Sequence, residues 1–303
     1  MSTEKKRMIA VALLATILLT AFAIVRPMDR HGVPETKFWY DKFASPADFD
    51  VVVAGDSRIL HGIDMQPFSD QGLGKGLNFG FQGAAANDEF VDASAARLND
   101  RGKKVLVLGI TPNGFTANSI ATNGYKEKLR EYKKTKFTLP NFLGAIVQRF
   151  RPLALADIRR MASGRKNPLQ RIHHADGWVE SRHAKPNEDS ALRFYKVRFD
   201  GNPIQTNEIE LTCETVKERV TDGVKVFGFK PPLSASMIEL ENEKSGFDYG
   251  DFVAKFSAAG GVWIEVDASQ FKTYDGSHLE SESATEFSSW LAAAIKSKLG
   301  EAN

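Results

Sequence analysis

The hydrophobic pattern of this chain alternates between short, mostly apolar runs and longer segments with helical spacing. Apolar runs of this length, bounded by glycine or polar residues, suit strands that are covered on both faces. They lie at 51–54, 77–81, 104–110, 224–229 and 262–266. Helical spacing is found at about 88–99, 208–220 and 249–259 and from 283 onward. Strands that alternate with helices predict an α/β fold, a flavodoxin-like three-layer sandwich with a parallel five-stranded sheet.

The N-terminus carries positive charge followed by an apolar run. Lys5-Lys-Arg7 precedes 8–25, which contains no charged residue and would extend about 27 Å as a helix, near the thickness of a bilayer core. Positive residues before the run place the N-terminus in the cytoplasm. We therefore expect 1–26 to form one N-terminal transmembrane helix. Ala21-Phe-Ala23 also resembles a signal-peptide cleavage site, so a cleaved signal is the alternative.

Either interpretation exports the globular part and localises it at the cell membrane, on the periplasmic or extracellular side. Residues 27–47, rich in proline, charge and aromatic side chains, are predicted to be a stalk. The α/β domain is expected at 48–299, interrupted by an insertion at 113–206.

The insertion is strongly basic, with eighteen Lys and Arg against eight Asp and Glu, whereas the whole chain has a formal net charge of +2. Its segment 141–161 has the pattern of an amphipathic helix, so a mostly helical insertion is predicted. One interpretation is a packed subdomain with a solvated basic surface. The other is a lid over the active edge that recognises an anionic substrate or lipid headgroups.

The composition limits the chemistry available. The single cysteine, Cys213, excludes an intrachain disulfide and a cysteine-rich metal site. His173-His174 and His183 are expected at the surface of the insertion, with metal binding as the less favoured alternative. His61 is expected on the surface of a helix. No metal and no cofactor are predicted.

Polar residues follow the ends of four predicted strands, and parallel α/β sheets bind ligands outside the carboxyl ends of their strands. Ser57 follows the first strand, Gly83 the second, 111–113 the third, and Asp275 with His278 the fifth. A serine nucleophile needs a base, and the base needs a group that holds its tautomer. A carboxylate three residues before a histidine on a turn can reach its Nδ1 atom. The sequence therefore predicts a Ser57–His278–Asp275 triad.

Three segments carry a family resemblance. Gly55-Asp-Ser-Arg58, Asn78-Phe-Gly-Phe-Gln-Gly83 and Asp275-Gly-Ser-His278 look like the first, second and fifth sequence blocks of the SGNH (GDSL-type) hydrolase superfamily. The resemblance covers the sandwich core, about 48–112 and 208–299, and does not include the insertion.

The resemblance implies the SGNH fold, with Ser57 as the nucleophile, His278 as the base and Asp275 as its orienting acid. It also implies an oxyanion hole built from the backbone N–H groups of Ser57 and Gly83. The family's third block, usually Gly-x-Asn-Asp, adds an asparagine donor, and here the sequence departs. Simple alignment places Thr111 at that position, while Asn113 lies two residues later.

Loss of one oxyanion donor costs about 2.7–4 kcal/mol of transition-state stabilisation, so efficient simple hydrolysis is in doubt. The export signal, the altered third block and the basic insertion together resemble the envelope-associated branch of the superfamily. That branch includes proteins similar to alginate O-acetyltransferases and the teichoic acid D-alanylation protein, which commonly act beside a membrane-bound O-acyltransferase partner.

The sequence therefore predicts a membrane-anchored serine esterase or O-acyltransferase that acts on acyl esters of a cell-envelope glycan or lipid. Hydrolysis and transfer share the acyl-enzyme and are not separated by the sequence. One alternative is a catalytically weak or inactive SGNH-like protein that binds or helps to assemble an acidic surface polymer. Another is a phospholipase at the membrane surface. Nucleic acid is not an expected partner, because export would remove it.

Overall fold

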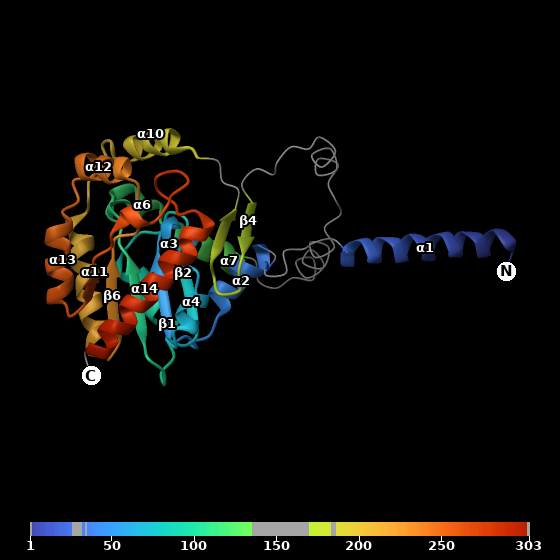
Figure 1. Cartoon of the computed structure of the whole chain (residues 1–303), viewed down its shortest axis with the longest axis horizontal. Helices are drawn as coiled ribbons and strands as arrows, with labels where there is room; N and C mark the ends of the chain where they lie inside the picture. Colours follow the sequence, from blue (N-terminus) through green and yellow to red (C-terminus); the bar gives the residue numbers. More distant parts are fainter. Residues whose placement is uncertain (1, 26–31, 34, 135–169, 183–185, 302–303) are drawn as a thin grey trace.

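A five-stranded parallel sheet forms the centre of the α/β domain (Figure 1). The computed structural model describes residues 2–25, 32–33, 35–134, 170–182 and 186–301. The sheet order is β2-β1-β3-β6-β7, and every neighbouring pair is parallel. The strands are β1 Val51–Gly55, β2 Gly76–Gly80, β3 Val105–Gly109, β6 Lys225–Phe229 and β7 Val262–Ile264. The predicted parallel sheet with a flavodoxin-like layout is confirmed.

The central strands are apolar throughout because both of their faces are covered. Every residue of β1 and β3 is buried. Side chains alternate between the two faces of a strand, so Val52 and Ala54 pack in one hydrophobic cluster while Val51 and Val53 pack in another.

Helices from both halves of the chain form the two outer layers. One cluster contains side chains of α5 Asp88–Ala95, α11 Thr206–Thr221 and α13 Tyr249–Ala258. The other contains side chains of α3 Ser57–Gly62, α4 Gln66–Asp70 and α14 Ser281–Glu301. The predicted helix at 88–99 ends earlier, at Ala95, and the last helix begins two residues earlier than predicted. Helices α4 and α12 Ala235–Lys244 were not predicted.

The N-terminal apolar run lies in helix α1 Thr3–Val25. A membrane-spanning helix needs about 20 consecutive, predominantly apolar residues. Over the residues that the structure describes, no helix is both long and apolar enough to span a bilayer. The predicted transmembrane helix is therefore not confirmed.

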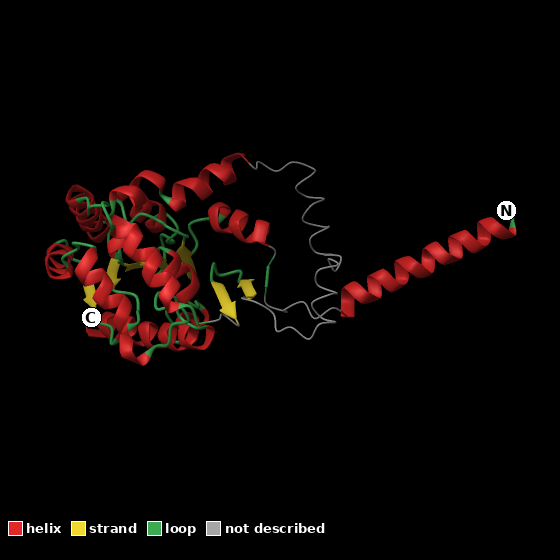
Figure 2. Ribbon diagram, turned by 90° about the horizontal axis from the view of Figure 1, so that it is seen from above, coloured by secondary structure: helices red, strands yellow, loops and turns green. Residues whose placement is uncertain are grey.

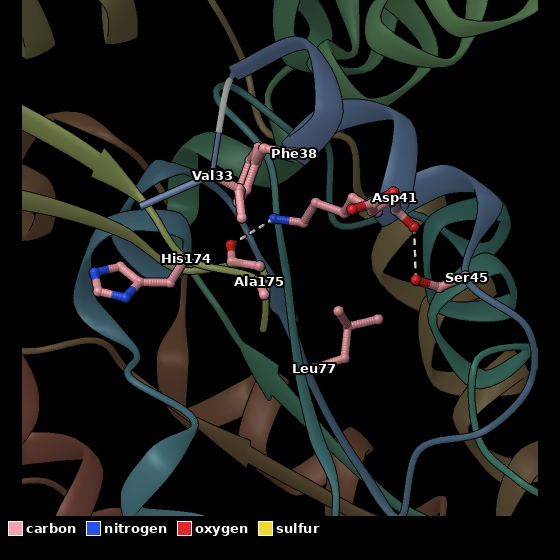
Figure 3. A pocket seen from close by; sticks show the side chains of 9 residues that line it. Val33, Phe38, Asp41, Ser45, Leu77, His174 and Ala175 are labelled. Carbon is pink, nitrogen blue, oxygen red and sulfur yellow. Dashed lines mark hydrogen bonds between the residues drawn. The ribbon is translucent and has the colours of Figure 1, made fainter. Parts of the chain in front are cut away.

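Residues 35–44 of the predicted stalk fold as helix α2 Glu35–Ala44 and bury Phe38, Lys42 and Phe43. The Lys42 ammonium donates to the Gly80 carbonyl at 2.7 Å and the Gly177 carbonyl at 2.9 Å. Burial lowers the pKa of Lys42 well below its ordinary value. A cavity of about 10 Å³ lies beside this contact (Figure 3). Lys42 thus ties α2 to the sheet and to the insertion.

The described part of the insertion is only partly helical. It contains η1 Pro112–Phe115, α6 Ala117–Thr122, α7 Gly124–Lys134, α10 Glu188–Phe199 and an antiparallel hairpin, β4 Gln170–His173 with β5 Val179–Arg182. The hairpin forms its own two-stranded sheet, separate from the main one (Figure 2). The predicted amphipathic segment 141–161 and His183 lie outside the described residues.

Candidate functional site

Ser57 lies at the sharp turn between strand β1 and helix α3, of which it is the first residue. Asp56 caps the helix, because its Oδ1 atom accepts the Arg58 backbone N–H at 2.9 Å. A Cβ atom at Gly55 would collide with the Ile59 side chain and the Gly109 carbonyl oxygen. Glycine at position 55 therefore lets the helix start immediately after the strand and places Ser57 at the carboxyl end of the sheet.

Asn78 fixes helix α3 to strand β2. It is fully buried, and its amide donates to the carbonyl oxygens of Ile59 at 2.7 Å and Ile63 at 2.8 Å. Its Oδ1 atom accepts the Gly80 N–H at 2.9 Å. Unpaired carbonyls at a helix C-terminus are costly when buried. Asn78 gives the Ile63 carbonyl a donor and adds a second donor to the Ile59 carbonyl, which also accepts the Ile63 N–H at 3.2 Å. It thereby holds the helix that begins with Ser57.

The three predicted triad residues lie together, although Ser57 and His278 are 221 positions apart. The Ser57 hydroxyl is 2.9 Å from His278 Nε2, and His278 Nδ1 is 2.9 Å from Asp275 Oδ2. Because a carboxylate accepts at Nδ1, that nitrogen carries the proton and Nε2 can accept from the serine. The other carboxylate oxygen of Asp275 accepts the backbone N–H groups of Ser277 at 2.9 Å and His278 at 2.7 Å.

The environment of Asp275 keeps it ionised. Burial alone raises the pKa of this carboxyl. The opposing effects are larger: a hydrogen bond from His278, its charge and two backbone N–H groups all lower the pKa. The net pKa therefore lies below its usual range. An ionised carboxylate at Nδ1 stabilises the imidazolium that forms when histidine takes a proton. This arrangement is chemically able to activate the Ser57 hydroxyl.

The two alternatives for the third-strand donor differ in their hydrogen bonds. The Thr111 hydroxyl is buried and donates to Asp56 Oδ2 at 2.9 Å, so its proton is already used. Asn113, in η1, accepts the Arg198 Nε–H at its Oδ1 atom at 2.6 Å. Its amide NH₂ group is therefore the donor that this loop can offer. Gly83 follows β2 with a positive φ of 65°, a conformation that favours glycine.

His61 is not the surface residue that the sequence predicts. Its side chain is buried, its Nδ1 atom lies 2.9 Å from the Val179 carbonyl, and its ring meets the His278 ring edge-on at 5.6 Å. Burial, followed by the charge of His278, lowers the pKa of His61 to about 3. The prediction was wrong because Val179 belongs to a hairpin that is distant in the sequence. His61 is thus a neutral partner packed against the histidine of the site.

Sequence reasoning also missed a buried network around Arg58. Its Nη2 atom contacts Glu241 Oε1 at 2.6 Å, and its Nε–H donates to the Ser277 hydroxyl at 3.1 Å. Ser277 donates in turn to the Tyr195 hydroxyl at 3.0 Å, and the guanidinium lies 5.2 Å from the Tyr195 ring centroid. The network connects the helix of Ser57 with α12, α10 and the loop of His278.

The structure describes two histidines of the insertion, His173 and His174. His174 Nε2 contacts Glu180 Oε2 at 3.0 Å, and His173 is partly buried. Within the described ranges, no group of three or more His, Cys, Asp or Glu side chains could hold a metal ion.

Replacement of Glu241 tests the buried ion pair. Burial by itself lowers the pKa of Arg58, but Glu241 raises it well above its ordinary value, so the guanidinium stays charged. Glu241→Gln would leave that charge unpaired in the core. We expect the free energy of unfolding, measured by urea denaturation, to fall by about 3–5 kcal/mol. The matched control is Glu239→Gln, at an exposed position of the same helix. If Glu241→Gln lowered the free energy of unfolding no more than this control does, the assignment of a buried ion pair would be contradicted.

His61 predicts a pH-dependent stability. In the unfolded chain a histidine takes up a proton below about pH 6.5, whereas His61 in the folded protein resists protonation down to about pH 3. The unfolded state binds more protons in this window, so stability falls as pH falls. Between pH 6.5 and 5 the loss from this group is about 2 kcal/mol. Urea denaturation of the wild type and His61→Gln at pH 7.5 and pH 5 measures it, and equal pH dependence in both would refute the prediction.

Comparison with solved structures shows a weak likeness to an esterase. The structure of the inhibitor-bound form of an aryl esterase from M. Smegmatis aligns with a TM-score of 0.31 and 11% sequence identity, over 82% of this chain and 98% of that chain. A likeness of that size does not assign an activity. No protein-family model matches the sequence, and no curated protein matches it.

Proposed function

We propose that this protein is a serine esterase or O-acyltransferase whose nucleophile is Ser57. The observation that carries the proposal is the unbroken hydrogen-bonded series from Asp275 through His278 to the Ser57 hydroxyl, with 2.9 Å at each of the two steps. The motif resemblance to SGNH hydrolases agrees with it, since the residues in those motifs form the series.

The chemistry follows from the donor and acceptor order. His278 Nε2 takes the proton of Ser57 as the Oγ atom attacks the acyl carbonyl, and Asp275 stabilises the resulting imidazolium. The tetrahedral intermediate collapses to an acyl-serine, and His278 returns the proton to the departing alcohol. Water or a second hydroxyl group, deprotonated by His278, then attacks the acyl-serine. The bond between the acyl carbon and Ser57 Oγ breaks, and His278 returns the proton to Ser57.

Negative charge develops on the carbonyl oxygen during both attacks and requires donors. The candidates are the backbone N–H groups of Ser57 and Gly83 and the side-chain amide of Asn113. Thr111 is a less suitable candidate because its hydroxyl proton is bound by Asp56. The Asn113 amide would take the place of the asparagine in the family's third block, from a position two residues later in the loop.

Loss of the nucleophile tests the proposal. Ser57→Ala and His278→Ala should each lower turnover of p-nitrophenyl acetate by at least about 10³-fold, because the triad acts as a unit. Ser57→Ala should also abolish labelling by a fluorophosphonate probe. Ser236→Ala, at an exposed position of α12, is the matched control and should behave as the wild type. Wild-type turnover in Ser57→Ala would sink the proposal.

We further propose that the substrate is an acyl ester of a glycan or lipid outside the cytoplasm. The basic residues before the N-terminal apolar run support export, and the basic insertion supports an anionic polymer or surface. Incubation with an O-acetylated anionic polysaccharide should release acetate, or yield an acetylated acceptor sugar when transfer is faster than hydrolysis. Release of fatty acid from phospholipid vesicles, with no acetate from the polysaccharide, would instead favour a phospholipase.

A further inference from the structure

Arg198 belongs to the insertion, yet its side chain reaches the third-strand loop of the site. It lies in the last turn of α10, and its Nε–H donates to the Asn113 Oδ1 atom at 2.6 Å. We propose that Arg198 is a positioning residue that sets the orientation of the Asn113 amide and thereby makes it an oxyanion donor. This inference rests on the proposed acyl-ester chemistry.

The argument begins with the chemistry of the two groups. An arginine guanidinium has only hydrogen-bond donors, whereas an asparagine amide has an accepting oxygen at one end and a donating NH₂ at the other. The end of Asn113 that faces Arg198 is therefore the oxygen. The NH₂ end is turned away from the guanidinium, and this is the end that can stabilise negative charge.

The opposite orientation of Asn113 would harm catalysis. If the amide were rotated by 180°, its carbonyl oxygen would take the place of the donor and would repel a developing oxyanion. A charged donor at 2.6 Å makes a hydrogen bond that is roughly twice as strong as one between neutral groups. Arg198 therefore supplies the energy that selects the productive orientation, and the backbone of Asn113 is held separately, since its carbonyl accepts the Thr116 hydroxyl at 2.9 Å.

Arg198 is itself held in place. Its backbone carbonyl accepts the side-chain amide of Asn202 at 2.9 Å, and Asn202 Oδ1 accepts the Asn118 N–H at 2.9 Å, which ties the end of α10 to α6. The guanidinium lies 5.6 Å from the centroid of the Phe194 ring. It also borders Gly83, where a Cβ atom would lie 3.9 Å from Arg198 Nη2. Arg198 thus lies beside two of the three proposed oxyanion contributors.

A double-mutant cycle in the full chain tests this role. With p-nitrophenyl acetate as the substrate, Asn113→Ala should lower kcat by about 10²–10³-fold, the usual effect of losing one oxyanion donor. Arg198→Ala should lower kcat by about 10–100-fold with little change in KM, because the donor is misoriented rather than removed. The double variant should match Asn113→Ala within about threefold, since Arg198 acts only through Asn113.

Several results would overturn the inference. If the two losses of kcat multiplied in the double variant, Arg198 would act independently of Asn113. An unchanged kcat in Arg198→Ala, or a rise in KM alone, would show that it does not set the oxyanion donor. Full activity in Ser57→Ala would be a failure of the proposed function and not of this step.

Two further variants separate the proposed effect from a loss of the fold. Arg193→Gln removes a positive charge from an exposed position of the same helix and should leave kcat unchanged. Arg198→Lys keeps the charge and the aliphatic stem but lacks the planar donor array, so the cycle can be repeated with it if Arg198→Ala unfolds. The expected kcat of Arg198→Lys lies between those of the wild type and Arg198→Ala, and its effect should also vanish in the Asn113→Ala background.

Discussion

A charge buried in a protein core must be paired, and the pair formed by Arg58 and Glu241 meets this constraint at the centre of the site. Arg58 directly follows the candidate nucleophile, while Ser277, which its Nε–H contacts, directly precedes the candidate base. One guanidinium therefore connects the segment of Ser57 with the segment of His278, and these two side chains must lie within hydrogen-bond distance of each other. Such a pair costs desolvation energy and is therefore weak evidence for stability in itself.

The insertion contacts residues of the candidate site directly. Its hairpin holds His61 through the Val179 carbonyl, and its helix α10 brings Tyr195 to Ser277 and Arg198 to Asn113. The sheet scaffold presents the nucleophile and the base, while the insertion constrains groups that surround them. The surroundings of the candidate triad are therefore built partly from residues outside the sheet scaffold.

The parallel sheet and the pairing of Asp275 with His278 were predictable because each depends on a local signal. Runs such as 51–54 are apolar on both faces, and Asp275 reaches His278 within one turn. The surroundings were not predictable by the same reasoning. His61 reads as an exposed helical residue, and its burial depends on a hairpin more than 100 positions away. No local signal marks Arg58 as a buried charge, because its partner Glu241 is brought to it only by the packing of α12.

The sequence by itself determined the parallel α/β core and the three residues of the candidate triad, since hydrophobic periodicity and short-range turn spacing are properties of contiguous residues. Only the tertiary structure shows how Thr111 and Asn113, the two alternatives for the oxyanion donor, differ in their hydrogen bonds. The hydroxyl of Thr111 donates to Asp56, and the amide oxygen of Asn113 accepts from Arg198. That difference depends on hydrogen-bond partners from distant elements, and the spacing of residues along a chain contains no information about which donor is already engaged.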